Sequence, residues 1–323
     1  SGPGGYTAAF RAADLGKNVV LIEANSSLGG VCLNVGCIPS KALLHVAKVI
    51  TEAEEMSAHG VTFAKPEIDL DELRAFKDSV VGKLTGGLDG LAKGRRVKVV
   101  KGYGKFTGPN MIAVEGADGT TNVSFDQCII AAGSEPVALP FIPHDDPRVI
   151  DSTGALELTE VPKHLVIIGG GVIGVELGQM FARAGVKVTI CCRSRLLPEA
   201  EPEISEALKT HLEAEGVTVC TGVGYQKIEP SAEGIKLTCE SLNCDGAGHC
   251  DTIAADKTIT AEKLLVAAGR KPNTASLDAD KARIKLLKNG GIETNEFMQS
   301  SNPDIYAAGD VTGTDMFVYM AAY

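Results

Sequence analysis

Hydrophobic and polar positions follow two different periods along the chain. Residues 1–16 show a glycine turn followed by the pattern of an amphipathic helix, and the apolar run after them, NVVLIE, has the pattern of a strand that ends at Glu23. Residues 164–192 contain a strand, a glycine turn, a helix and a strand in that order. Gly5 and Glu23 are 18 residues apart, and so are Gly174 and Cys192. The pattern predicts two dinucleotide-binding βαβ units, the first beginning without its leading strand.

Further strands follow each of these two units. FDQCIIAAGSEP and EKLLVAAGRKPN both read as a strand ending in a small-residue turn, and NPDIYAAGDV reads as another strand with a Gly-Asp end. The polar, glycine-rich stretch CESLNCDGAGHC predicts a hairpin. We expect an α/β protein of two Rossmann-like domains, with residues 1–145 and 271–323 forming the first domain and residues 146–270 inserted into it as the second.

Composition and charge narrow the class of protein. The 323 residues are 44% hydrophobic and 22% charged, which is typical of a globular protein with room for two cores. The formal net charge of -10 argues against nucleic acid as a main partner. We find no apolar run near the roughly 20 residues of a membrane helix and no targeting leader, so we expect a cytoplasmic protein without a membrane partner. Nine cysteines are too few for a disulfide-built scaffold of this length.

The glycine turns are the first candidate binding sites. A GxGxxG turn lets the backbone approach a pyrophosphate and directs the N-terminus of the following helix at its charge. Gly169, Gly171 and Gly174 match this motif in full, while Gly2 and Gly5 match its second and third glycines. A single such turn is weak evidence, but two at matching distances from a strand favour dinucleotide binding over structural turns. Further expected cofactor contacts are Gly4, Gly30, Gly104, Ala132, Gly133, Gly269, Arg270 and Gly309.

The strand ends after the two turns differ in chemistry. Glu23 occupies the position where a carboxylate accepts hydrogen bonds from a ribose. The corresponding residue of the second unit is Cys192, followed by Arg193 and Arg195. Arginines bind a 2′-phosphate that a carboxylate would repel. We hypothesise that NADPH is tolerated or preferred over NADH there, the alternative being that the two arginines are solvated surface residues.

Cys32 and Cys37 form a CxxxxC pair directly before an amphipathic helix, with Pro39 in its first turn. The spacing allows a small disulfide ring, and a helix N-terminus favours the thiolate. A zinc site would need a second close pair of ligands, which the sequence does not show, so we expect no bound metal. Two inert buried cysteines remain the alternative to a redox couple.

The segment GGVCLNVGCIPSKALLH resembles the active site of flavoprotein disulfide reductases, specifically of dihydrolipoamide dehydrogenases, and the similarity extends over most of residues 1–180. The resemblance implies FAD at the first turn and NAD or NADP at the second. It implies that Cys37 faces the flavin and that Cys32 exchanges with a dithiol or disulfide substrate. It further implies that Lys41 pairs with Glu176 near the flavin, and that Asp310 binds the ribityl and phosphate region.

The second half of the chain resembles mercuric reductases, most clearly in SSNPDIYAAGDVTGTDMFVYMAAY. These enzymes use NADPH, which agrees with the arginines after Cys192. The segment CLNVGCIP departs from their pattern, and Val172 stands where some of them carry a tyrosine. Reduction of mercury(II) is therefore the alternative to a dihydrolipoyl dehydrogenase activity.

The resemblance implies a C-terminal dimerisation domain that completes the site in dihydrolipoamide dehydrogenases and a C-terminal cysteine pair that completes it in mercuric reductases. We expect both to be absent because the sequence stops at Tyr323. A fragment that binds FAD and NAD(P) without a complete active site is thus a further alternative. The resemblance implies a homodimer in the full-length protein, with a small dithiol, a lipoyl domain or a 2-oxoacid dehydrogenase complex as partner.

We expect His45 to be a helix-surface or core residue, and His164 and His249 match no catalytic motif. The neighbouring Cys191 and Cys192 read as buried strand residues, and Cys239, Cys244, His249 and Cys250 form a loose cluster that favours no zinc site.

Overall fold

The computed structural model describes residues 1–243 and 257–322, which divide into two compact units. Unit 1 comprises Ser1–Ile38, Ser79–Glu135 and Arg270–Tyr323, and unit 2 comprises Pro39–Asp78 and Pro136–Gly269. The predicted fold class is confirmed, because the chain is α/β and its strands bear the two glycine turns. The predicted domain boundaries remain a prediction; these units differ from them mainly in residues 39–78.

Unit 1 is built around short parallel strand pairs and an antiparallel sheet. Helix α1 (Pro3–Asp14) contacts β1 (Val20–Glu23) and β6 (Cys128–Ile130). β1 pairs in parallel with β2 (Lys98–Lys101), and β6 pairs in parallel with β16 (Ile305–Ala307). The remaining elements of this unit are α2 (Gly30–Val35), β3 (Tyr103–Gly108), β4 (Met111–Gly116), β5 (Gly119–Ser124), β7 (Ser134–Pro136), β15 (Arg270–Pro272), the 3₁₀ helices η3 (Ala279–Ala282) and η4 (Gly309–Thr312), and α8 (Val318–Ala322).

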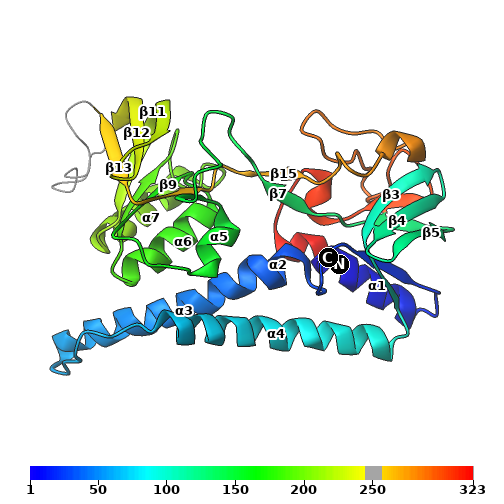
Figure 1. The fold of residues 1–323 in the computed structure, drawn as a ribbon, viewed down its shortest axis with the longest axis horizontal. Helices are drawn as coiled ribbons and strands as arrows, with labels where there is room; N and C mark the ends of the chain where they lie inside the picture. The colour runs from blue at the N-terminus through cyan, green and yellow to red at the C-terminus, as the bar shows by residue number, and fades with distance from the viewer. Residues whose placement is uncertain (244–256, 323) are drawn as a thin grey trace. The chain divides into compact units, whose positions relative to one another are not determined.

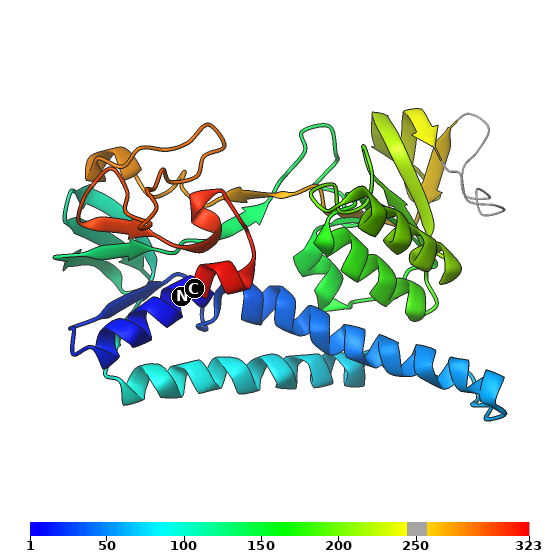
Figure 2. The ribbon, with the colours of Figure 1, turned by 180° about the vertical axis from the view of Figure 1, so that it is seen from behind.

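Two apolar clusters hold unit 1 together. One surrounds α1 and β1, where Phe10 and Leu21 pack with Leu28, and the other joins β4, β6 and β16 through Val114, Ile130 and similar side chains. Helix α8 packs on α1, so the two ends of the described chain lie side by side (Figures 1 and 2). β6 contacts α1 as well, and Ala131 and Ala308, in the loops that follow β6 and β16, lie next to Gly5 and Gly4 at the beginning of α1.

Unit 2 contains a seven-stranded sheet in the order β13-β12-β11-β10-β9-β14-β8. Helices α5, α6 and α7 pack on this sheet (Figure 1). Alternate residues of β9 enter different apolar clusters, since Leu165 and Ile167 pack with the helices whereas Val166 and Ile168 belong to the second cluster. The elements are β8 (Val149–Ile150), α5 (Ser152–Glu157), β9 (His164–Ile168), α6 (Val172–Arg183), β10 (Lys187–Cys191), α7 (Pro202–Ala214), β11 (Thr218–Pro230), β12 (Ile235–Asn243), β13 (Thr258–Ala261) and β14 (Lys263–Val266).

β12 pairs antiparallel with β13, and the predicted hairpin of residues 239–250 lies mostly outside the described residues. Residues 244–256, with Cys244, His249 and Cys250, lie outside them. β9 has parallel neighbours on both sides, β10 and β14. The connections from β9 thus diverge at its carboxyl end, which is the topological switch point where α/β sheets bind ligands.

Two long helices connect the glycine-rich beginning of the chain with its strands. They are α3 (Cys37–Glu55), followed by η1 (Met56–His59), and α4 (Leu70–Gly94). Leu43 is buried in the main core of unit 2, and Leu44 and Leu73 pack against that core. This packing explains why residues 39–78 fall within unit 2.

The helical stretch Gly30–His59 corrects one expectation from the sequence. By length and composition alone it could cross a membrane, although 28% of its most apolar window is buried in the protein. The core helix of a soluble protein passes the same test, and this stretch contributes Leu43 to the core of unit 2. The stretch is therefore weak evidence for a membrane.

Candidate functional site

The first glycine turn begins α1 and is closely packed on both sides. Gly2 is the N-cap of α1 and Pro3 its first residue, so glycine supplies no side chain to cap the helix N–H groups. A Cβ on Gly4 would lie 2.9 Å from the carbonyl oxygen of Ala321, and one on Gly30 would lie 2.5 Å from Cα of Gly2. The turn therefore requires glycine at these positions and leaves helix N–H groups available to an anion.

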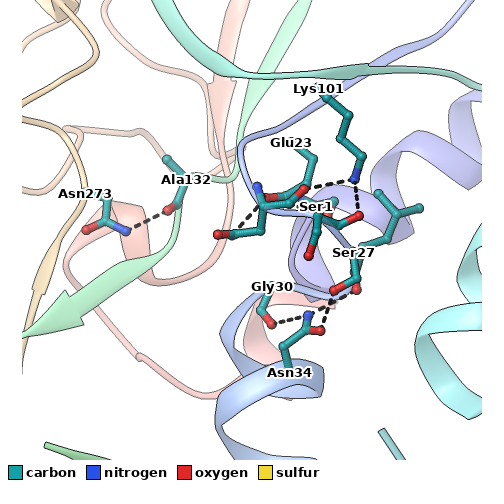
Figure 3. Close-up of polar contacts among 11 residues, drawn as sticks. Ser1, Glu23, Ser27, Gly30, Asn34, Lys101, Ala132 and Asn273 are labelled. Carbon is teal, nitrogen blue, oxygen red and sulfur yellow. Dashed lines mark hydrogen bonds and ion pairs between the residues drawn. The ribbon is translucent and has the colours of Figure 1, made fainter. Parts of the chain in front are cut away.

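Glu23 lies at the end of β1, and only 6% of it is exposed. Its carboxylate accepts hydrogen bonds from the amino group of Ser1 at 2.8 Å, from the Ser1 hydroxyl, and from the backbone N–H of Asn25 at 2.7 Å (Figure 3). Burial by itself raises the pKa of Glu23, whereas the hydrogen bonds from the Ser1 hydroxyl and the Asn25 N–H lower it. The side chain is an ionised acceptor, as ribose binding requires.

A lysine that the sequence analysis overlooked supports the loop after Glu23. Lys101, at the end of β2, donates to the carbonyl oxygens of Asn25 and Ser26, both at 3.0 Å (Figure 3). β1 and β2 are in register with Glu23 opposite Lys101, which explains the contact. A lysine 78 positions away carries no local sequence signal.

The loops after β6 and β16 form the remaining walls of the first turn. A Cβ on Gly5 would lie 3.5 Å from Cβ of Ala131, and one on Gly4 would lie 3.4 Å from Cβ of Ala308. The structure thus brings the segments of Ala132–Gly133 and Gly309–Asp310 to the first turn, with Ala132 held by an amide hydrogen bond from Asn273 at 3.0 Å (Figure 3). The predicted residues that meet in unit 1 are Gly2, Gly4, Gly5, Glu23, Gly30, Ala132, Gly133, Gly309 and Asp310.

Two further predicted glycines and a predicted arginine are placed by contacts of other kinds, and the arginine, Arg270, lies 4.0 Å from Asp310. Gly104 is on β3, where a Cβ would meet the side chains of Ile112 at 3.3 Å and Ile22 at 3.5 Å, so its visible contacts are packing contacts. Gly269 has a φ of +116° and its carbonyl accepts from Val137 at 3.0 Å. Arg270 begins β15 and donates to the backbone and hydroxyl of Ser134.

The second glycine turn, at the carboxyl end of β9, has equally strict steric demands. A Cβ on Gly169, whose φ is +119°, would lie 2.1 Å from the carbonyl oxygen of Ala267, and one on Gly174 would lie 2.2 Å from that of Gly169. Gly171 is the N-cap of α6, and a Cβ there would meet nothing within 4 Å. The turn is therefore closely packed at Gly169 and Gly174 and open at Gly171.

The strand end beside this turn carries a buried thiol and two different arginines. A Cβ on Gly170 would lie 2.9 Å from Cβ of Cys192, so the thiol residue is adjacent to the turn. Burial raises the pKa of Cys192 to about 11, and its Sγ donates to the Cys220 carbonyl at 3.4 Å. Arg193 is exposed, whereas Arg195 donates to the carbonyl oxygens of Pro198 at 3.0 Å and Ala200 at 2.7 Å. The two arginines are therefore not equivalent.

The CxxxxC pair spans the junction of two helices. Cys32 lies in α2 and Cys37 is the first residue of α3; both are half-buried. Gly36 ends α2 with φ −140° and ψ −113°, and a Cβ there would lie 2.9 Å from the Val31 carbonyl oxygen. Cys32 also raises the pKa of Tyr6 in α1, after the larger effect of burial, which places the two side chains near each other.

Asn34, between the two cysteines, is a structural residue that the motif did not reveal. Its amide donates to the carbonyl oxygens of Leu28 at 3.1 Å and Gly30 at 2.9 Å, and accepts from the Ser27 hydroxyl at 2.6 Å (Figure 3). Gly29 and Gly30 have φ values of +111° and +59°. Asn34 thereby fastens the left-handed turn that leads into the helix of Cys32.

Lys41 of α3 and Glu176 of α6, both in unit 2, form an ion pair of 2.5 Å although 135 residues separate them. The Ser40 hydroxyl donates to the other carboxylate oxygen at 3.1 Å. The pairing implied by the resemblance is therefore present in the structure. The roles of both residues toward a flavin remain predictions.

The other cysteines and histidines contribute no second centre in the described residues. Cys191, Cys220 and Cys239 are buried, and residues 1–243 and 257–322 contain no group of three metal-ligating side chains. His45 is exposed on α3. His164 bridges strands through Thr260 and Thr189, each at 3.1 Å, a role within the sheet.

Comparisons with known proteins agree with this geometry. The model of the pyridine nucleotide-disulphide oxidoreductase family matches residues 1–323. The dihydrolipoyl dehydrogenase of Vibrio parahaemolyticus is 46% identical over 100% of this chain and 66% of its own length, and the mitochondrial dihydrolipoyl dehydrogenase 1 of Arabidopsis thaliana is 40% identical over 99% and 62%. The chain thus spans about two thirds or slightly less of these relatives.

A solved structure gives the same result at the level of the fold. The HOCl-induced flavoprotein disulfide reductase RclA of Escherichia coli, in a Cu(II) complex, is 30% identical with a TM-score of 0.83, over 99% of this chain and 66% of that one. The match to the family model along the whole chain is decisive: this chain belongs to the pyridine nucleotide-disulphide oxidoreductase family.

Proposed function

We propose that this chain is the two-dinucleotide part of an FAD-dependent dihydrolipoyl dehydrogenase-type oxidoreductase. The observation that carries the proposal is that Cys32 and Cys37, on the consecutive helices α2 and α3, both lie in the unit that contains the first glycine turn. The names of the curated relatives support this function over mercury(II) reduction.

The residues of the first turn fit FAD. The helix N-terminus at Gly2 offers N–H groups to a pyrophosphate, and the ionised Glu23 offers acceptors to a ribose. Asp310 lies two residues after Ala308, which contacts Gly4 of the same turn. When bound, FAD would carry two electrons between a nicotinamide nucleotide and the cysteine pair.

The second turn fits a nicotinamide nucleotide, because Gly171 leaves open space at the N-terminus of α6 and at the switch point of the sheet. We propose NADPH as tolerated or preferred over NADH. Support comes from the neutral Cys192 in place of a carboxylate and from the exposed Arg193. Steady-state kinetics with both nucleotides test this, and a large preference for NADH contradicts it.

The chemistry of the cysteine pair is thiol–disulfide exchange. In the reducing direction, the Cys32 thiolate attacks one sulfur of the substrate disulfide and forms a mixed disulfide with it. The other substrate sulfur takes up a proton and leaves as the first thiol. Cys37 then attacks Cys32, which closes the Cys32–Cys37 disulfide and releases the second substrate thiol. Two electrons and two protons pass from the enzyme dithiol to the substrate, and oxidation of a dihydrolipoyl group reverses these steps.

Lys41 and Glu176 act on this chemistry through charge. The ammonium of Lys41, one helical turn after Cys37, is held by Glu176 and favours a thiolate nearby. The N-terminus of α3, where Cys37 lies, has the same effect.

Cysteine variants of the full-length protein test the function. We expect Cys37→Ser and Cys32→Ser to abolish lipoamide turnover while flavin absorbance is retained, and Cys128→Ser, a thiol of β6 in the same unit, to keep turnover. Undiminished lipoamide turnover in Cys37→Ser contradicts the role. Mercury(II)-dependent NADPH consumption in excess thiol, with no lipoamide turnover, would instead support the alternative.

Partners and assembly follow from the same proposal. We propose a lipoyl group as substrate, a homodimer for the full-length protein, and a cytoplasmic location. Gel filtration combined with lipoamide assays of this chain tests whether it completes an active site: a monomer without turnover supports the binding-only alternative for residues 1–323.

A further inference from the structure

Three segments that are distant in sequence meet at the Ser134 side chain in unit 1. Ser134 is 3% exposed, and its Oγ donates to Oδ2 of Asp310 at 2.5 Å. Arg270 donates through Nε to the same Oγ at 2.7 Å and through a terminal nitrogen to the Ser134 carbonyl at 2.6 Å. Arg270 Nε itself is 4.0 Å from Asp310 Oδ2, so the hydroxyl bridges the cation and the carboxylate.

The chemistry of the three groups fixes the direction of the hydrogen bonds. A guanidinium can only donate and an ionised carboxylate can only accept. The Ser134 hydroxyl must therefore accept from Arg270 and give its single proton to Asp310. Hydrogen bonds to charged groups are the strong ones, and burial strengthens them further.

This arrangement holds one side of the Asp310 carboxylate. In residues 1–243 and 257–322, the side-chain hydrogen bond of Asp310 runs through Oδ2, which leaves Oδ1 to accept from another group. The Asp310 side chain is 26% exposed, and Gly309 before it has a φ of +75°. A carboxylate oxygen of this kind takes a hydroxyl donor, such as those of a polyol chain.

The carboxylate also stands beside the first glycine turn. Ala308 packs on Gly4, and Ala131, three residues before Ser134, packs on Gly5. The Ala308 N–H donates to the Ile130 carbonyl at 2.9 Å, which joins the segments of Asp310 and Ser134. The bridge therefore lies at the walls of the proposed FAD site.

We propose that Ser134 is a positioning residue for FAD: its hydroxyl, oriented by Arg270, holds the Asp310 carboxylate so that Oδ1 accepts from a hydroxyl of the flavin polyol chain. The inference rests on the proposed FAD site. The motif residues of the glycine turn and Asp310 would touch the cofactor, whereas Ser134 acts through Asp310.

Titration of FAD into the apo form of the full-length protein, followed by flavin fluorescence, tests this proposal. We expect Ser134→Ala to weaken FAD binding about tenfold to a hundredfold, the effect of losing a hydrogen bond to a charged group. Ser134→Thr keeps the hydroxyl and should restore most of the affinity. Ser301→Ala removes a hydroxyl that donates to the Arg283 carbonyl at 2.8 Å elsewhere in the unit, and serves as the matched control with unchanged affinity.

A double-mutant cycle separates positioning from a general structural effect. In the Asp310→Ala background, Ser134→Ala should cause no further loss of FAD affinity, because the group it orients is gone. A full additional loss in that background overturns the proposal, as does wild-type affinity in Ser134→Ala when Asp310→Ala binds weakly. Should Ser134→Ala fail to fold, Arg270→Lys is measured in the same two backgrounds and judged by the same rule. If wild-type protein binds no FAD, the proposed function itself fails, which is a distinct result.

Discussion

The two glycine turns use the same backbone device but end in opposite chemistry. In unit 1 the strand after the turn ends at Glu23, a buried carboxylate that accepts hydrogen bonds from the Ser1 hydroxyl and the Asn25 N–H. In unit 2 the corresponding residue is Cys192, a buried thiol whose pKa burial raises to about 11. One position carries a negative charge and the other is neutral.

The comparison shows where a dinucleotide site is general and where it is selective. Gly4 in the first turn and Gly169 and Gly174 in the second are required by close contacts with backbone atoms, whichever nucleotide binds. The residue at the strand end, in contrast, differs in chemistry between the two units, as Glu23 and Cys192 show. Selectivity in this chain should therefore reside at Glu23 and at Cys192 with Arg193.

The largest expected effect comes from filling the second turn. Gly174→Ala forces a Cβ to 2.2 Å from a carbonyl oxygen, so we expect loss of nicotinamide nucleotide binding and about 1–3 kcal/mol of destabilisation. Gly171→Ala has open space, so its melting temperature should match wild type while NADPH binds about tenfold more weakly. Calorimetry and nucleotide titration check both variants. Full NADPH affinity in Gly171→Ala would show that the pyrophosphate does not bind at this turn.

The next effect concerns the carboxylate of unit 1. Glu23→Gln removes the charge of a buried acceptor, and we expect FAD binding to weaken about tenfold to a hundredfold. Cys192→Ala, the corresponding change in unit 2, should leave FAD affinity unchanged. Fluorescence titration of the apo proteins measures both, and equal FAD affinity in Glu23→Gln and wild type would show that no ribose binds at Glu23.

A smaller effect distinguishes the two arginines of unit 2. Arg193→Gln should raise the KM for NADPH about tenfold and leave the KM for NADH unchanged, because an exposed guanidinium is available to a 2′-phosphate. Arg195→Gln should affect both nucleotides alike, since Arg195 is engaged with the carbonyl oxygens of Pro198 and Ala200. A selective loss of NADPH in Arg195→Gln instead would reverse the assignment.

The smallest effect is a difference in acid sensitivity between the units. Burial lowers the pKa of His164 in unit 2, and the positive charge of Lys187 lowers it further. The hydrogen bond with the Thr260 backbone and the charge of Glu262 oppose this shift without cancelling it. Since the unfolded chain then binds the proton more readily, the free energy of unfolding falls as the pH drops below about 6.5. We expect His164 to lower the free energy of unfolding by less than about 1 kcal/mol, because its side chain is partly exposed. Denaturation of wild type and His164→Gln at pH 5 and 7.5 checks this; an equal pH response in both proteins excludes His164.

Sequence reasoning was successful where chemistry depends on local spacing. The α/β class, both glycine turns and the strand-end positions of Glu23 and Cys192 follow from periodicity and from motifs of a few residues. The Lys41–Glu176 pair could be expected only through the resemblance, since nothing local relates two residues on different helices.

What the sequence could not predict are contacts that the tertiary fold creates. Lys101 reaches the Glu23 loop because β1 and β2 pair, and Ser134 meets Asp310 and Arg270 because three loops converge. The difference between Arg193 and Arg195 likewise depends on the path of the backbone at Pro198 and Ala200. Serine, lysine and arginine are common on surfaces, so their identity alone gives no signal.

The strands β7 and β15 pair with each other, and the chain passes from unit 1 to unit 2 through one and returns through the other. The Val137 N–H donates to the Gly269 carbonyl at 3.0 Å, so the entry and exit points of this excursion are neighbours. A segment whose two ends meet can be exchanged for another of the same kind without stretching its host. Nucleotide preference is thus open to replacement by exchange of residues 136–269, through recombination or by a protein engineer, provided that the new segment keeps the core positions on which Leu43 and Leu73 of residues 39–78 pack.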